Sequence, residues 1–195
     1  SSSATSIPRV INEITSTAVM TRAASSDSFQ TNNSMRSAAS SGSDYWGAGG
    51  GSGTTYYGSG TPAVLQDTTS NTRVINVYNG SLYYSTGSIN ASGVGIYKVG
   101  TGLPKTTGQT ITAIALTGVG SSPYAFVFNA SGSVLYVADD RTGTGGGVQK
   151  YTKSGGVYTL AYTLSVGTAR GARGVCVDFS GASPVLYATR SEEHT

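Results

Sequence analysis

The sequence predicts an all-β fold made of repeated antiparallel sheets, and three observations lead to this prediction. A strand–turn–strand phrase recurs four times, beginning at Met35, Thr72, Pro123 and Ala172. Amphipathic runs with the period of a helix are nearly absent, whereas the stretch 157–164 alternates at period two, as a strand does. Glycine accounts for 28 residues and charged residues for only 11% of the chain, which suits short strands joined by many turns.

The spacing of the phrases indicates the architecture. Trp46, Tyr84, Tyr136 and Tyr187 are expected to take the matching place in each phrase, and the steps between them are 38, 52 and 51 residues. A period of about 40–50 residues with several strands per unit is typical of β-propeller blades. We therefore expect a β-propeller fragment of about three and a half to four four-stranded antiparallel blades in an open, incomplete ring.

Apolar runs bounded by turn residues predict the individual strands. The stretches 9–14 and 18–22 are expected to be the two outer strands of a preceding blade. The first complete unit is expected to have strands at 35–39, 44–48, 54–57 and 63–65, and the second at 72–78, 81–85, 94–99 and 110–115. Asn79-Gly80, between the first two strands of the second unit, is the strongest hairpin signal in the chain. The third unit is expected to have strands at 124–128, 134–138, 147–153 and 157–165, and the last phrase only two strands.

These strands predict the organisation of the chain. It comprises a partial preceding blade and linker at 1–34, blades at 35–71, 72–122 and 123–169, and the first half of a blade at 170–190. Residues 191–195 resemble the translated read-through of a sequencing-library adapter, so we expect a non-native tail and exclude it. The tail contains His194, the only histidine, and Glu192 and Glu193. Since a blade cannot bury both faces alone, we expect the fragment by itself to be marginally stable or aggregation-prone.

Composition argues against several function classes. The formal net charge is +3, but the basic residues are scattered, whereas a nucleic-acid groove needs them clustered, so we expect no nucleic-acid partner. The longest apolar runs have the length of strands, so we expect no membrane span. Cys176 is the only cysteine, and its position in the predicted strand VCVDF favours a small buried apolar residue over a nucleophile.

The composition also favours an extracellular or cell-surface location. Lysine and glutamate are few, whereas serine, threonine, glycine and tyrosine are abundant. Glycosylation sequons of the type Asn-x-Ser begin at Asn32, Asn79, Asn90 and Asn129.

Several phrases resemble a known family. They are NTRVINVYNGSLYYSTGS, GVGIYKVGTGLPKTTGQTIT, SPYAFVFNASGSVLYVADD, GGVQKYTKSGG and LYATR. Over most of 35–189 the chain looks like secreted, largely uncharacterised propeller-repeat proteins of bacteria and algae. VLYVADD followed by GGVQKYTKSGG resembles, more loosely, the strand phrases of lactonase-like and other six- or seven-bladed propellers. The resemblance implies a secreted propeller of about seven blades. It implies no firm activity.

Candidate binding residues are expected at one rim of the propeller. Because successive strands are antiparallel, the innermost strand of a blade starts on the rim where the second strand ends. Three units place an arginine at the start of the innermost strand, whereas the third unit has Ala125 there; the arginines are Arg36, Arg73 and Arg173. Their planar guanidinium groups are suited to a carboxylate, phosphate or sulfated sugar. The alternative is structural, with each arginine bound to a carboxylate or to backbone carbonyls of the neighbouring blade.

The same rim carries Asp139, Asp140 and Arg141. The two aspartates are candidates for a Ca²⁺ site, which needs six to eight oxygen ligands, with carbonyls of 142–145 as additional ligands. Adjacent side chains on a strand point to opposite faces, so the favoured alternative is a solvated acid paired with Arg141, and no cofactor is expected. Asp178 is expected to cap the turn at Ser180-Gly181.

Three functions remain open. The favoured hypothesis is a non-catalytic, secreted or cell-surface propeller that binds a protein or a glycan, because no nucleophile–base pair is evident. The second is a propeller hydrolase or lactonase that depends on a divalent metal, with Asp139, Asp140 and Asp178 among its ligands and further ligands from missing blades. The third is a repeat scaffold without a small-molecule site.

Overall fold

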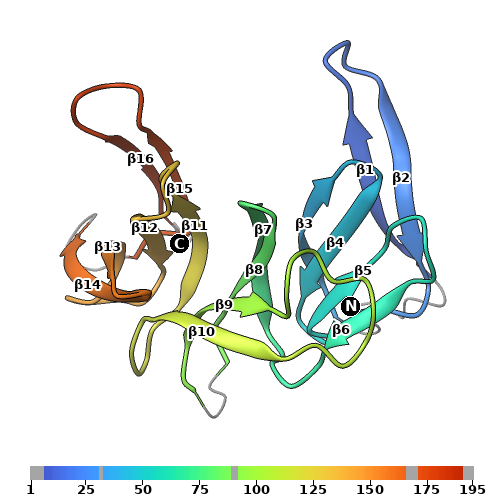
Figure 1. Ribbon diagram of the computed structural model, residues 1–195, viewed down its shortest axis with the longest axis horizontal. Coiled ribbons are helices and arrows are strands. Elements are labelled where there is room, and N and C mark those ends of the chain that lie inside the picture. The colour runs from blue at the N-terminus through green and yellow to red at the C-terminus, as the bar shows by residue number, and fades with distance from the viewer. Residues whose placement is uncertain (1–6, 31–32, 89–91, 166–170, 191–195) are drawn as a thin grey trace, which may run out of the picture. The chain divides into compact units, whose positions relative to one another are not determined.

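The computed structural model describes residues 7–30, 33–88, 92–165 and 171–190. Sixteen strands and no helix occur in these residues. The strands form three four-stranded antiparallel sheets and two two-stranded hairpins (Figure 1). The all-β prediction is therefore confirmed, and the repeated sheets are propeller-like blades that, in the described part of the chain, form no closed ring. The same residues contain no helix that is long and apolar enough to cross a membrane.

Within every sheet the strands pair in sequence order. The first hairpin consists of β1 (Arg9–Ile14) and β2 (Met20–Ser26). The first sheet consists of β3 (Met35–Ser41), β4 (Asp44–Gly49), β5 (Thr54–Tyr56) and β6 (Ala63–Gln66). The second consists of β7 (Thr72–Tyr78), β8 (Ser81–Thr86), β9 (Gly95–Val99) and β10 (Ile111–Leu116). The third consists of β11 (Pro123–Phe128), β12 (Val134–Asp139), β13 (Gly147–Ser154) and β14 (Val157–Leu164), and the last hairpin of β15 (Gly174–Asp178) and β16 (Val185–Thr189).

Most strand boundaries lie within a few residues of the predicted ones. The turn at Asn79-Gly80 has φ of +45° and +66°, the left-handed conformation that an Asn-Gly hairpin turn requires. The largest shift is in β2, which runs from Met20 to Ser26 instead of 18–22. Strand β1 pairs only with β2, so the assignment of both as outer strands of a blade stays a prediction.

The chain divides into two compact units, Ser1–Tyr84 with Lys98–Thr112, and Ser85–Tyr97 with Ala113–Thr195. In the first unit, β3 and β4 contact β7. Ile11 of β1 packs there with Phe29 and Tyr57, whose rings meet edge to face at 5.4 Å. Trp46 of β4 is fully buried and donates its indole N–H to the carbonyl of Pro104 at 2.8 Å. The cluster around Ile11 holds the first hairpin against the first sheet, and Trp46 joins that sheet to the segment between β9 and β10.

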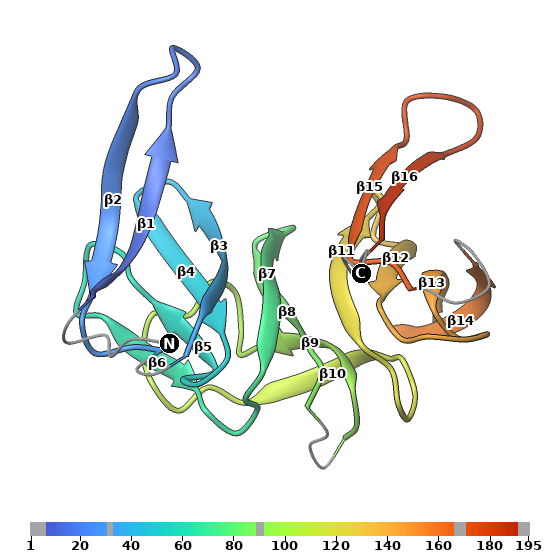
Figure 2. The same cartoon turned by 180° about the vertical axis from the view of Figure 1, so that it is seen from behind.

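In the second unit, β11 and β12 contact β15 (Figure 2). Tyr136 and Ala138 of β12 are buried there, and the side chains packed against their cluster from the last hairpin are Val175, Val177 and Leu186. The opposite face of this hairpin carries Cys176, which is exposed. The prediction that Cys176 is buried is therefore wrong. Alternation along β15 turns it away from the core, and no described strand covers that face.

The equivalence proposed for the four aromatic residues also needs a correction. Trp46, Tyr136 and Tyr187 are each the third residue of their strand, whereas Tyr84 is the fourth residue of β8. The residue in the matching place is therefore Tyr83, whose ring lies 6.4 Å from that of Tyr78. Because neighbouring side chains on a strand point to opposite faces, Tyr84 belongs to the other face of its sheet.

Candidate functional site

The six predicted site residues lie at strand ends, as expected, and belong to the two units separately. Arg36 and Arg73 are the second residues of β3 and β7 in the first unit. In the second unit, Asp139 ends β12, Asp140 and Arg141 follow it, and Arg173 directly precedes β15. Each group therefore has to be considered within its own unit.

Asp139 is the centre of a buried polar network in the second unit. Its Oδ1 accepts hydrogen bonds from the backbone N–H groups of Ser122 at 2.9 Å and Arg141 at 3.0 Å. Its Oδ2 accepts from Arg141 Nε at 3.0 Å and from Gln149 Nε2 at 3.2 Å. Arg141 also donates through Nη2 to the carbonyl of Thr117 at 2.7 Å. The carboxylate of Asp139 thus has about as many donors as it has lone-pair sites.

Two further side chains complete this network. The hydroxyl of Tyr151 lies 2.7 Å from Oε1 of Gln149 and 3.3 Å from the carbonyl of Leu116. Burial, followed by the negative charge of Asp139, raises the pKa of Tyr151, so this hydroxyl stays protonated as a donor. The network links the end of β12 to β13 and to the segment before β11. Its role is therefore to stabilise the fold of the second unit.

Asp140 and Arg173 form the second ion pair of this unit. Arg173 Nε lies 2.7 Å from Oδ2 of Asp140, and its guanidinium lies 5.1 Å from the ring centre of Tyr124. The hydrogen bond to Asp140 is the main reason that the pKa of Arg173 is raised. Tyr124 thus contacts the guanidinium of this arginine, and the backbone N–H of Ala125 donates to its carbonyl at 3.1 Å. The pairing agrees with the structural alternative, in which the arginine binds a carboxylate of the neighbouring sheet.

The aspartates offer little to a cation in this arrangement. The four hydrogen bonds that the carboxylate of Asp139 accepts would compete with a metal ion for its oxygens. The carboxylate of Asp140 faces the guanidinium of Arg173. Within 7–30, 33–88, 92–165 and 171–190, no group of three or more His, Cys, Asp or Glu side chains is placed to hold a metal ion. Asp178 instead accepts the backbone N–H of Ser180 at 2.8 Å, the turn contact that the sequence predicted.

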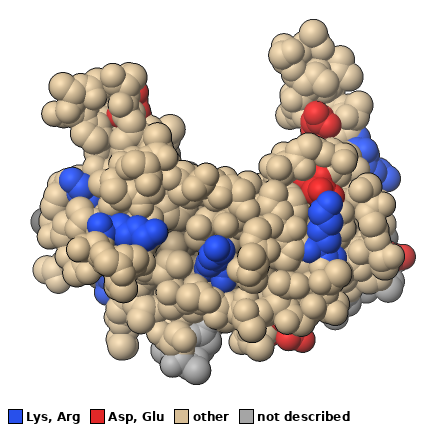
Figure 3. Space-filling view, in the orientation of Figure 1, with Lys and Arg blue, Asp and Glu red and all other residues tan. Residues whose placement is uncertain are grey.

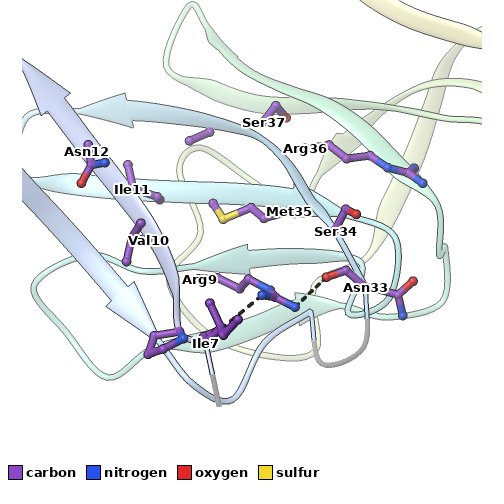
Figure 4. A pocket seen from close by; sticks show the side chains of 12 residues that line it. Ile7, Arg9, Val10, Ile11, Asn12, Asn33, Ser34, Met35, Arg36 and Ser37 are labelled. Atoms are coloured by element: carbon purple, nitrogen blue, oxygen red, sulfur yellow. Dashed lines mark hydrogen bonds between the residues drawn. The ribbon is translucent and has the colours of Figure 1, made fainter. Parts of the chain in front are cut away.

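The first unit contains a groove between β1 and β3. It has a volume of about 600 Å³ and is lined by residues 7–12 and 33–38. A second hollow of about 190 Å³ continues along the same two strands, because Ile11, Asn12 and Ala38 line both. Two arginines contribute to the wall, Arg9 and Arg36 (Figure 4).

The two arginines are held in similar ways. Arg9 donates to the carbonyls of Ile7 at 3.2 Å, Asn33 at 2.9 Å and Gln30 at 3.2 Å. Arg36 donates through Nη1 to Oδ1 of Asn71 and to the carbonyl of Thr72 at 3.4 Å. In both cases the arginine lies near the start of one strand, and two of its acceptors lie shortly before or at the start of the next sheet: Gln30 and Asn33 for Arg9, and Asn71 and Thr72 for Arg36.

Sequence reasoning missed Arg9, although a signal was present. Pro8-Arg9-Val10 opens a strand with an arginine, as Met35-Arg36 and Thr72-Arg73 do. Treating 9–14 as an outer strand concealed this likeness. Arg73 is half-buried on β7 and does not line the groove.

The charges around Arg36 differ from those around Arg173. Arg36 is exposed, and its acceptors are a neutral amide and a neutral carbonyl, with no ion pair in the described part of the chain. On the face shown in Figure 3, the Lys and Arg side chains do not gather into one large basic patch. Comparison of the chain with family models, with curated proteins and with solved structures found no match.

Proposed function

We propose that this chain is part of a non-catalytic, secreted or cell-surface propeller that binds an anionic glycan in the groove between β1 and β3. The observation that carries the proposal is Arg36, an exposed residue at the edge of the groove, whose guanidinium extends toward the start of β7 (Figure 4) and is bound only to neutral oxygens. A positive charge without a carboxylate partner attracts an anion more strongly than one already paired. The resemblance to secreted propeller-repeat proteins supports the secreted location and implies no firm activity.

The geometry of Arg36 suits a carboxylate or a sulfate. Both of its hydrogen bonds use Nη1, so within the described residues its Nε and Nη2 hydrogens make none. Two adjacent N–H groups of a guanidinium match the oxygens of such an anion in a bidentate pair. Side chains that can bind sugar hydroxyls line the same groove: Asn12, Asn33, Ser34 and Ser37.

The hydrolase hypothesis has weaker support. Such an enzyme needs several carboxylate or amide ligands around one divalent ion. Asp139 is already bound by Arg141 and Gln149, and Asp140 by Arg173. A metal site at these positions would have to break the contacts that join the parts of the second unit.

A secreted location is part of the proposal, and the sequons supply a test of it. Asn79 is exposed at the tip of the β7–β8 turn, where a glycan has room. Asn129 is less suitable, because its amide nitrogen donates to the hydroxyls of Ser131 and Ser133. Asn32 and Asn90 lie outside the described residues. In a eukaryotic secretion host we expect glycosylation at Asn79, which Asn79→Gln would remove as a single mass step.

Binding to heparin, hyaluronan and neutral dextran tests the function directly. We expect heparin to bind best, dextran not to bind, and Arg36→Ala to weaken heparin binding about tenfold, the loss expected for one charge-assisted bond. Arg173→Ala is the matched control, since it removes the same charge at the same place of the repeat but from a residue paired with Asp140. Arg36→Lys should fall between wild type and Arg36→Ala, because it keeps the charge and loses the fork. Equal heparin affinity of wild type and Arg36→Ala would refute the proposal.

A further inference from the structure

The last hairpin has an apolar face that nothing in the described chain covers. Cross-strand pairs place Cys176 beside Tyr187, and Asp178 beside Val185, on one face of β15 and β16. Tyr187 is 62% exposed and Val185 is 50% exposed. We call these four residues the β15–β16 outer face. The opposite face of the same hairpin packs against Tyr136 and Ala138.

The repeat indicates what kind of surface fits the outer face. Strands β12 and β16 begin with the same tripeptide, Val134-Leu135-Tyr136 and Val185-Leu186-Tyr187. Tyr136 is only 1% exposed, because the apolar face of the next hairpin lies on it. Since Tyr187 holds the same place in its strand, the surface that fits it is the apolar face of another β-hairpin.

The first hairpin presents such a face. Ile11 of β1 packs into the core of the first unit, so the alternating residues Val10 and Ile14 point away from it. Ile14 pairs with Met20, and Asn12 pairs with Arg22. Ile14 is 69% exposed and Met20 is 65% exposed. We call Val10, Ile14, Met20 and Arg22 the β1–β2 outer face.

The two outer faces carry opposite charges. Arg22 is exposed and makes no hydrogen bond or ion pair within the described residues. Asp178 is exposed, and only its Oδ1 is bound, to the backbone N–H of Ser180. Pairing two identical faces would bring like charges together, whereas pairing different faces brings Arg22 toward Asp178.

We propose that copies of this chain associate head to tail, with the β1–β2 outer face of one copy docked on the β15–β16 outer face of another. Each contact then buries the exposed apolar side chains of both faces, as Tyr136 is buried inside a single copy. Such a heterologous contact forms a ring if the rotation closes and a filament if it does not. The proposal does not rest on glycan binding, although a docked copy would cover Val10, which also lines the groove.

The oligomeric state of the 195-residue chain is the first test. In sedimentation velocity from roughly 1 to 100 µM, a concentration range that resolves weak contacts, we expect the mass to rise above the 19.8 kDa of one chain. Tyr187→Ser should abolish the rise. Val119→Ser is the matched control, because Val119 is 91% exposed but belongs to neither outer face. A wild-type monomer throughout this concentration range would overturn the proposal.

Charge reversal tests the pairing of the faces. Arg22→Glu and Asp178→Arg should each weaken association by about tenfold, through repulsion at the new contact. An equimolar mixture of the two variants should associate again, because the face altered in one variant then meets either an unaltered or a complementary partner. Circular dichroism of each variant confirms the fold before mixing. Association that charge reversal leaves unchanged, or that mixing does not restore, would contradict a head-to-tail contact.

Discussion

Arg36 of the first unit and Arg173 of the second hold similar places in the repeat but bind different partners. In the second unit, Arg141 and Arg173 lie beside the carboxylates of Asp139 and Asp140. In the first unit, Arg36 lies at the edge of the groove and binds only neutral oxygens. A position in a repeat therefore determines where a guanidinium lies, while its neighbours determine whether its charge is available to a ligand.

The reason lies in the residue that ends the second strand of the sheet or hairpin before each arginine. That residue is Ser26 of β2, before Arg36, and Asp139 of β12, before Arg173. Asp139 accepts a hydrogen bond from the guanidinium of Arg141, and Asp140, the next residue, pairs with Arg173. Ser26 carries no charge, and its hydroxyl instead accepts a hydrogen bond from the backbone N–H of Ser28 at 3.1 Å. The comparison can be tested by removing these groups one at a time.

Asp139→Ala should have the largest effect on stability. It removes a fully buried carboxylate and leaves the guanidinium of Arg141 without its ion partner. Breaking a buried pair in this way costs about 3–5 kcal/mol. Urea unfolding of wild type and variant measures the difference in free energy. Asp139→Asn keeps the shape and part of the hydrogen bonding, so it should lose less, and a loss below about 1 kcal/mol for Asp139→Ala would mean that the network is not structural.

Asp140→Ala should have a smaller effect on the same measurement. Its partner Arg173 is about half exposed, so water takes over much of the interaction. Exposed pairs contribute about 0.2–1 kcal/mol, and added salt should reduce the difference further. If Asp140→Ala destabilised the protein as much as Asp139→Ala, the distinction between the two pairs would be wrong.

A third ion pair makes the first unit sensitive to acid. Asp44 Oδ2 lies 2.6 Å from Nζ of Lys105, and Oδ1 accepts the hydroxyl hydrogen bond of Tyr56 at 2.5 Å. The hydrogen bond to Lys105, and then the one to Tyr56, lowers the pKa of Asp44. A lowered pKa means that this carboxylate stabilises the fold above its unfolded pKa of about 4 and loses that contribution as the pH falls through its folded pKa. Wild type should therefore lose more thermal stability than Asp44→Asn between pH 7 and pH 3, and parallel losses would contradict this.

Arg36→Ala should have the smallest effect on stability. Arg36 is exposed and its hydrogen bonds go to a side-chain amide and one carbonyl, so the change should stay within about 0.5 kcal/mol. The loss of heparin affinity caused by Arg36→Ala, about tenfold, should be much larger than its effect on the free energy of unfolding. A melting temperature that falls as far as that of Asp139→Ala would show that Arg36 is a structural residue like Arg141.

Some of the site could be predicted from the sequence and some could not. Arginines and aspartates at strand starts and ends were found because turns and alternation show where strands begin. The partners of Asp139 were less accessible, since Gln149 and Ser122 come from other segments that only the sheet brings near. Arg9 was missed because its role depends on β1 lying beside β3.

The amino-acid sequence by itself determined the all-β class, the strand positions and the repeated sheets, because turn residues and period-two alternation are local properties of the chain. Only the tertiary structure decided which face of a strand is covered. Tyr136 and Tyr187 share a tripeptide, yet one is buried and the other exposed. Cys176 is exposed for the same reason. Burial depends on whether another sheet lies against a face, and no residue within the strand itself contains that information.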